Sequence, residues 1–360
     1  MSKTGNIKWV DSAKGIAIIL VVMMYAAYSV GEVAGNVSIF HYIIGFTTPF
    51  RMPEFFLISG LFLSIGIGRS WSNFLDKRFV HYLYFYVIWV AILIVVKIGI
   101  FSANPILALN YLGWAMVEPY SMLWFIYILA FFSLAAKIAY SLKIPHWVML
   151  LGAAILQITP VQTISVAINN FSEYFIYFYV GYVFATQIFN IINYLQSRII
   201  LAIAVLIAFF TINLTLVFFP SYSINIASFE LGLAGIPILH LIMALLGSLA
   251  VCLVAAMVSK YNFMNWLNWL GAHSIVVYLG FSLPMTISRE LFLKMNIIND
   301  AGQLTFIIIL IAVISPLFLY AIIQKTGIGK FLFERPQWAH IPLKTGRFEP
   351  KGKYYNIPAK

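Results

Sequence analysis

The sequence predicts an all-α integral membrane protein, built as a single bundle of about ten transmembrane helices. Hydrophobic residues make up 62% of the 360 residues, and charged residues make up only 9%. A soluble domain typically carries about 25% charged residues, because water must solvate its surface. The chain also has long continuous apolar runs, and its basic residues gather in alternate loops. These three observations indicate that lipid covers most of the protein, and the long runs disfavour a β-barrel.

Ten apolar segments are long enough to cross a hydrocarbon core of about 30 Å, which takes roughly 20 helical residues. The first segment follows the charged pair Asp11 and Lys14 and has no clean cleavage site, so we expect it to remain as helix one. The fifth segment is short because Pro145 and Pro160 bracket it. In chain order, the expected spans are 10–30, 51–67, 79–100, 121–139, 145–160, 171–188, 199–219, 237–258, 268–288 and 304–324.

No Gly/Ser linker, low-complexity tract or convincing internal repeat interrupts these spans, so we expect one transmembrane domain over residues 1–325. Residues 71–81 are aromatic and basic, which is typical of an interfacial stretch leading into the third helix. Residues 101–120 and 220–236 are predicted to lie at the outer interface. The basic tail, 326–360, contains four prolines, and we expect it to be extended or poorly ordered from Gly327 onward.

The distribution of basic residues predicts that both termini are cytoplasmic. With the N-terminus inside, the N-terminal segment and the cytoplasmic loops contain nine Lys and Arg residues, and residues 325–360 contain eight more. The expected outer segments contain only Arg51, Arg289 and Lys294. This asymmetry follows the positive-inside rule. It also explains the net charge of +11 through contact with anionic membrane lipids rather than nucleic acid. The expected location is the cell membrane, and specifically a bacterial inner membrane.

The sequence contains no motif for a bound metal or cofactor. The single cysteine, Cys252, excludes an internal disulfide and a cysteine metal cluster. Zinc-binding, P-loop, dinucleotide-binding and nucleophile-elbow motifs are also missing from the sequence. We therefore expect no bound metal and no resident cofactor.

Ionisable residues inside a bilayer cost free energy, so each one is a candidate functional residue. Asp11 and Lys14 are three residues apart on one helix face and are expected to pair. Tyr25 follows Lys14 by eleven residues, or about 16 Å of helical rise, on the same face. The alternative interpretation is that Asp11 and Lys14 only cap and anchor the first helix.

A second group of candidates lies in the segment from Arg51 to Gly60, which includes Glu54 and Ser59. Pro53 suits the first turn of a helix, and Glu54 there would complement the helix dipole. A helix start would thus explain both residues without a functional role. It does not explain Arg51, whose guanidinium suits a carboxylate, a phosphate or a sugar hydroxyl.

These residues resemble the acyltransferase 3 family of integral membrane acyltransferases. The resemblance lies in Asp11, a basic residue and Gly15 at the start of helix one, followed by Met-Pro-Glu-Phe-Phe-Leu-Ile-Ser-Gly at 52–60. Residues 123–127 (Leu-Trp-Phe-Ile-Tyr) and 269–279 agree with it, and it covers roughly residues 9–325. It implies transfer of an acyl group, commonly acetyl from acetyl-CoA, to a hydroxyl of an envelope glycan or lipid. Acyl-CoA would be a co-substrate.

The family carries a basic residue on helix one and a histidine eleven positions later, which is taken as the general base. Lys14 matches the basic, donor-binding position, whereas Tyr25 occupies the histidine position. A free tyrosine has a pKa near 10, against about 6.5 for histidine. Only about one tyrosine in a thousand is ionised at pH 7, so Tyr25 is a poor base that can still orient a hydroxyl.

Three further residues are weighed as members of this site. His41, before the second predicted span, is a candidate replacement base, although a lone histidine is more often interfacial or packed. His273, near the cytoplasmic face with Lys14, is a candidate ligand for a CoA phosphate. Glu173 is either an acceptor-binding residue beside Arg51 and Glu54 or a helix cap, and the cap is slightly favoured.

The sequence therefore predicts a membrane O-acyltransferase, with Tyr25, Lys14, Asp11 and His41 as catalytic candidates. Acceptor-binding candidates are Arg51, Glu54, Ser59 and Glu173, and donor-binding candidates are Lys14 and His273. The alternative is a catalytically silent relative that acts in binding, scaffolding or glycan translocation, and Tyr25 is its main support. An unrelated secondary transporter is disfavoured because paired intramembrane charges and broken-helix repeats are missing.

Overall fold

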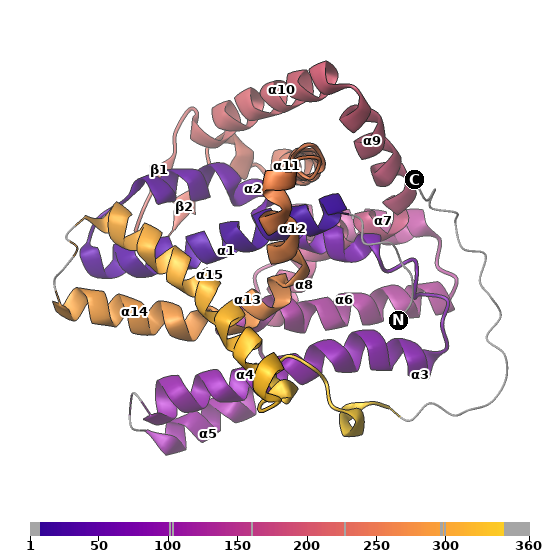
Figure 1. Ribbon diagram of the computed structural model, residues 1–360. Helices are drawn as coiled ribbons and strands as arrows, with labels where there is room; N and C mark the ends of the chain where they lie inside the picture. The colour runs from indigo at the N-terminus through magenta and orange to yellow at the C-terminus, as the bar shows by residue number, and fades with distance from the viewer. Residues whose placement is uncertain are drawn as a thin grey trace.

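The computed structural model describes residues 8–100, 102, 104–159, 161–226, 228–295, 298 and 300–341. In this part of the chain the protein is almost entirely helical (Figure 1). The α-helices are α1 (Lys8–Ala34), α2 (Ile39–Leu61), α3 (Trp71–Phe74), α4 (His81–Ile94), α5 (Pro105–Trp114), α6 (Trp124–Ser141), α7 (His146–Ile158), α8 (Val166–Val183), α9 (Ala185–Ser197), α10 (Ile199–Phe218), α11 (Pro237–Val258), α12 (Asn265–Ala272), α13 (Ser274–Gly280), α14 (Ser282–Met295) and α15 (Ala301–Thr326).

The remaining elements are short. Two π-helical stretches, Leu75–Val80 and Val95–Ile100, flank α4, and a two-stranded antiparallel hairpin pairs β1 (Ser223–Ile224) with β2 (Phe229–Glu230). Five single turns of 3-10 helix lie at Ser121–Leu123, Leu233–Gly235, Asn262–Met264, Lys330–Leu332 and Gln337–Ala339.

Among the described residues, six helical segments are long and apolar enough to cross a membrane. The number rises to eight if each bent pair, α8 with α9 and α13 with α14, is one span. Each of the ten predicted spans coincides with helix, but α2 and α7 fall outside this set. Polar residues and two prolines interrupt α2, and α7 has only 13 residues. The predicted all-α membrane bundle is confirmed, with six to eight candidate spans.

Several predicted boundaries are wrong because tertiary packing extends the helices. α2 begins at Ile39 rather than near residue 51. Residues 71–81 form the first part of one continuous helix of 30 residues, Trp71–Ile100, and their interfacial position stays a prediction. The segment 101–120 contains the helix α5, and residues 220–236 contain the β-hairpin.

The orientation of the bundle in the membrane stays a prediction. We expect reporter fusions after Ser102 and Ser221 to report the outside, and fusions after Ser141 and Lys260 to report the cytoplasm, because basic loops remain inside. Alkaline phosphatase and fluorescent-protein activities would measure the two sides. A C-terminal fusion reporting the outside would contradict the prediction.

Two glycines allow α2 and α8 to cross with their backbones in contact. A Cβ atom at Gly60 would lie 2.1 Å from the carbonyl oxygen of Phe178, and one at Gly181 would lie 2.2 Å from that of Leu57. Neither distance is compatible with a side chain, so the two backbones would have to separate. Small residues at helix crossings are typical of membrane proteins, where close packing drives helix association. This crossing fixes the part of α2 that carries Arg51 and Glu54 against α8.

We expect Gly181→Ala to destabilise the protein, because its methyl group would collide with the Leu57 carbonyl. Overpacking of this kind typically costs about 1–3 kcal/mol. The matched control is Gly152→Ala in α7, where a Cβ would meet no atom within 4 Å. Thermal unfolding of both variants in detergent would measure the difference. Equal melting temperatures for the two variants would show that the crossing tolerates a side chain.

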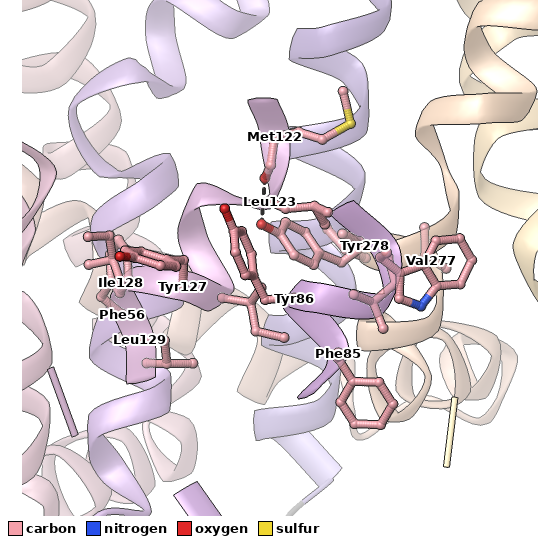
Figure 2. Packing of buried hydrophobic residues seen from close by; sticks show 14 of the residues in the cluster. Phe56, Phe85, Tyr86, Met122, Leu123, Tyr127, Ile128, Leu129, Val277 and Tyr278 are labelled. Atoms are coloured by element: carbon pink, nitrogen blue, oxygen red, sulfur yellow. Dashed lines mark hydrogen bonds between the residues drawn. The ribbon is translucent and has the colours of Figure 1, made fainter. Parts of the chain in front are cut away.

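Aromatic residues fill the centre of the bundle and join segments that are distant in sequence. Figure 2 shows Tyr86, Tyr127 and Tyr278 gathered around Leu123. The Tyr278 hydroxyl donates a hydrogen bond to the Met122 carbonyl, just before α6 begins (Figure 2). The sequence segments 123–127 and 269–279 therefore meet in the fold.

The C-terminal segment up to Ile341 packs against the helix that contains α4. The Arg335 guanidinium pairs with the Asp76 carboxylate at 2.7 Å, and both side chains are buried. The Ile341 amide donates to the same carboxylate at 2.8 Å, and the Trp89 indole donates to the Leu332 carbonyl at 2.9 Å. The prediction of an extended or poorly ordered tail is wrong for this stretch. Residues 342–360 lie outside the described residues.

Candidate active site

The candidates that the sequence predicts to lie near the cytoplasmic face are at the start of α1. The Lys14 ammonium is 3.3 Å from the Asp11 carboxylate, which confirms the predicted pair. Asp11 is buried, whereas the Lys14 side chain keeps 32% of its surface exposed. The ammonium also lies 5.5 Å from the centre of the Phe62 ring, a cation–π contact. Lys14 is thus held in place by two neighbours and still has free surface.

The helix α12 packs directly on this end of α1. A Cβ at Gly271 would lie 1.6 Å from the Asp11 carbonyl oxygen, and one at Gly15 would lie 2.6 Å from the Leu267 carbonyl oxygen. Both glycines are therefore required by the backbone contact. The Ser12 hydroxyl adds a hydrogen bond to the Asn268 side chain across the same contact.

His273 ends α12 on the same side of the bundle. Its Nδ1 lies 2.8 Å from the Trp269 carbonyl oxygen, and its ring lies between the rings of Trp269 and Tyr320, at 4.6 and 5.6 Å. The Nε2 atom makes no hydrogen bond with the described residues, so one ring nitrogen remains available to a ligand. The close packing of α12 on α1 brings this histidine to the end of the bundle that holds Lys14.

Tyr25 lies three turns further along α1, in the interior of the bundle. α1 is continuous from Lys8 to Ala34, so an eleven-residue step rotates by only about 20° and rises about 16 Å. Tyr25 is half-buried, and its ring lies 5.6 Å from that of Phe281. Lys14 and Tyr25 therefore share one helix face, as the sequence predicts.

Arg51 is the central charge of the second group. Its side chain is 6% exposed, and its guanidinium lies within electrostatic range of the hydroxyls of Tyr25, Tyr28 and Tyr174. Its hydrogen bond to protein is a long one, 3.4 Å, from Nη1 to the Ile44 carbonyl oxygen. The Nε atom is buried without a partner among the described residues. Arg51 thus links α1 and α8 around a polar centre and keeps hydrogen-bonding capacity unused.

Glu54 is fully buried, and neither carboxylate oxygen has a hydrogen-bond partner among the described residues. The prediction that Pro53 and Glu54 start a helix is wrong. Both lie in the fourth turn of α2, where Glu54 meets no free helix N-terminus. A buried carboxyl group without a partner is costly, so the structural explanation for Glu54 no longer applies.

Aromatic side chains enclose this polar centre. The Tyr174 ring stacks on Phe56 at 5.3 Å and lies 5.4 Å from the Trp124 ring. Sequence reasoning missed Tyr174 as a site residue, although it lies in the aromatic run 174–179, and Trp124, although it lies in the segment that supports the resemblance. The signal was weak because aromatic residues occur throughout membrane proteins.

Glu173 and Ser59 occupy different environments. α8 begins at Val166 with Ser165 as its cap, so the interpretation of Glu173 as a helix cap is wrong. Glu173 is exposed and interacts with the Tyr174 side chain, which itself lies within electrostatic range of Arg51. The Ser59 hydroxyl instead donates to the Phe55 carbonyl at 2.8 Å within α2.

His41 is 2% exposed and fastens the start of α2 to the β-hairpin loop. Its Nδ1 lies 3.1 Å from the Ser38 amide nitrogen and therefore accepts, while Nε2 lies 3.2 Å from the Ile226 carbonyl oxygen and therefore donates. Its ring is 5.9 Å from Tyr28, which is almost one turn beyond Tyr25. Both ring nitrogens are engaged, so a substrate proton could reach this imidazole only after the Ser38 contact breaks.

Comparison with known proteins gives one match. A family model described as an acyltransferase domain matches residues 7–324. No curated protein and no solved structure matches the chain. The matched range contains every residue of the two groups described above.

Proposed function

The chain belongs to the acyltransferase 3 family of membrane acyltransferases, and from this premise we propose that it is an O-acyltransferase of the cell envelope. It would move an acyl group, acetyl in the first instance, from acyl-CoA to a hydroxyl of a glycan or lipid. The membrane would be a bacterial inner membrane, with the acyl-CoA approaching from the cytoplasm.

The observation that carries this proposal is the arrangement along α1. Lys14, with free cationic surface, and Tyr25, beside the buried Arg51, lie on one face of one continuous helix. A cation near the cytoplasmic end suits the phosphates of CoA. A polar centre about 16 Å deeper suits an acceptor with several hydroxyls. The two substrates would thus approach along the same helix face from opposite sides.

In this proposal each group has one role. Lys14, positioned by Asp11, binds the donor, and the free Nε2 of His273 assists. Arg51 and Glu173 bind the acceptor, and Tyr25 orients the reacting hydroxyl. The hydroxyl oxygen attacks the thioester carbonyl carbon, the new C–O bond forms, the C–S bond breaks, and the proton finally reaches the CoA thiolate.

The proton needs a carrier, because tyrosine is almost entirely protonated at neutral pH. Glu54 follows Arg51 by three residues on α2 and has both oxygens without a partner among the described residues, and Glu173 interacts with Tyr174, which lies within electrostatic range of Arg51. We assign this relay to them ahead of His41, whose nitrogens are occupied. Ser59, bonded within its own helix, supports α2 and does not contact the substrate in this proposal.

A second candidate function has one observation in its favour. Tyr25 stands where the family has its general base, and general-base catalysis contributes roughly 10²- to 10⁴-fold. A chain without that base is a candidate for a silent relative that binds, scaffolds or translocates a glycan. The two functions predict different chemistry in the cell envelope.

Mass spectrometry of envelope glycans and lipids, with and without the protein, tests the proposal. We expect the mass of one acyl group, roughly 42 Da for acetyl, to disappear from a defined acceptor in cells without the protein. An identical acyl profile in expressing and deleted cells would favour the silent relative. The matched control is a strain with the protein restored from a plasmid.

A further inference from the structure

Two basic residues near Tyr25, Lys97 and Arg289, lie within electrostatic range of each other and have no role in the proposal above. Lys97 lies in the π-helical stretch Val95–Ile100 after α4, and its ammonium donates to the Ser282 hydroxyl at 3.0 Å. Arg289 lies on α14, and its Nη1 donates to the Ser29 hydroxyl on α1 at 2.6 Å. Each cation is thus directed at a serine of another helix.

The two serines place these cations beside Tyr25. Ser29 follows Tyr25 by four residues, which is one helical turn on the same face of α1. Ser282 directly follows Phe281, whose ring contacts the Tyr25 ring at 5.6 Å. The Lys97–Arg289 pair therefore lies about one turn from Tyr25, on the side away from Lys14.

The charges of this pair are poorly compensated. Among the described residues, no carboxylate lies within ion-pair distance of Lys97, and the one carboxylate that pairs with Arg289 is that of Glu290, whose side chain is 52% exposed. The Arg289 Nε is buried without a partner in the described part of the chain. The two cations also lie close enough to repel each other. Packing alone does not explain two like charges within electrostatic range of each other, each of which donates to a serine hydroxyl of another helix.

The alternative interpretation gives each of the two basic residues a separate structural role. Lys97 would extend its chain toward the interface, and Arg289 would form an ordinary surface pair with Glu290. This account leaves their proximity unexplained, and also the local π-helix, a feature found frequently at functional sites. An anion bound by both cations would offset their repulsion. It would also accept a hydrogen bond from the unused guanidinium nitrogen and from the two serine hydroxyls.

We propose that Lys97, Arg289, Ser29 and Ser282 form a binding site for a phosphate group of the acceptor. A phosphate carries up to two charges and several acceptor oxygens, which matches a guanidinium fork, an ammonium and two hydroxyls. The inference rests on the proposed function and specifies its acceptor as a phosphate-bearing glycan or lipid. The phosphate would hold the acceptor while one of its hydroxyls reaches Tyr25.

The test measures binding, so it does not depend on acyl transfer. The full-length protein would be placed in phosphatidylcholine nanodiscs, and a short-chain polyprenyl diphosphate would be titrated in and followed by native mass spectrometry. We expect Lys97→Gln and Arg289→Gln each to weaken binding by at least about tenfold, because each removes a charge-assisted contact. Arg289→Lys should recover part of the loss, and Glu290→Gln should strengthen binding by removing a competing carboxylate.

Lys294→Gln is the matched control, because Lys294 is an exposed lysine on the same helix and should bind like the wild type. Thermal unfolding of every variant checks that the fold is retained. Phosphatidylglycerol is then added as a competitor of the probe. If it displaces the probe from the wild type but not from the same two variants, the site is supported and is assigned to a lipid headgroup.

The site would be overturned if the folded Lys97→Gln and Arg289→Gln variants bound both phosphate probes like the wild type. It would equally be overturned if Lys294→Gln weakened binding as much as they do, since general surface charge would then be the cause. Binding without any acyl transfer would contradict the proposed function and leave the phosphate site intact. Acyl transfer without phosphate binding would contradict the phosphate site and leave the proposed function intact.

Discussion

Tyr25→His is expected to raise acyl transfer by a factor on the order of 10² or more, the usual contribution of a general base. Histidine is substantially unprotonated at pH 7, whereas tyrosine is almost never ionised. The smaller imidazole should fit the half-buried position beside Phe281 without strain. Transfer of labelled acetyl from acetyl-CoA to envelope extract would measure the change.

Tyr25→Phe is the paired variant, because it keeps the ring and removes only the hydroxyl. A loss of native activity would show that the phenol orients the acceptor or relays its proton. Activity that persists with phenylalanine would assign proton transfer elsewhere, and Glu54→Gln, Glu173→Gln and His41→Ala would then identify the group. His41→Ala requires a stability measurement beside it, because His41 also joins Ser38 to Ile226.

The enzymatic proposal would be overturned if neither the wild type nor Tyr25→His transferred any acyl group. The measurement would have to include several acyl-CoAs and native envelope extract, with folding of both proteins confirmed. The silent relative would then be preferred.

Lys14→Ala is expected to weaken acyl-CoA binding by about 10- to 100-fold, the range of one charge-assisted contact to phosphate. Lys14→Arg should retain binding, because the positive charge remains. Isothermal titration of the purified protein with CoA and acetyl-CoA would measure the affinities.

The matched control for Lys14 is Lys8→Ala, which removes an exposed charge from the first turn of the same helix. Its affinity for CoA should remain that of the wild type. If Lys14→Ala also bound CoA normally, Lys14 would be an interfacial anchor that pairs with Asp11 and has no donor role.

Much of the candidate site could be predicted because it depends on local helical geometry. The pairing of Asp11 with Lys14 and the shared face of Lys14 and Tyr25 follow from spacing along one helix. The interpretation of Glu54 as a helix-start residue failed because it depends on contacts with other helices. Pro53 suits a helix start, but α2 continues through it, because contacts to other helices stabilise the residues before the proline as helix.

The sequence by itself determined that this protein is a helical membrane protein of the acyltransferase 3 family, because composition, helix length and short motifs are local properties of the chain. Only the tertiary structure decided which side chains meet. It placed Tyr174 and Trp124 around the site and occupied both nitrogens of His41. It also left Glu54 without a hydrogen-bond partner among the described residues and brought Lys97 within electrostatic range of Arg289. Those outcomes depend on how helices distant in sequence cross, and glycine contacts such as Gly60–Phe178 set that geometry.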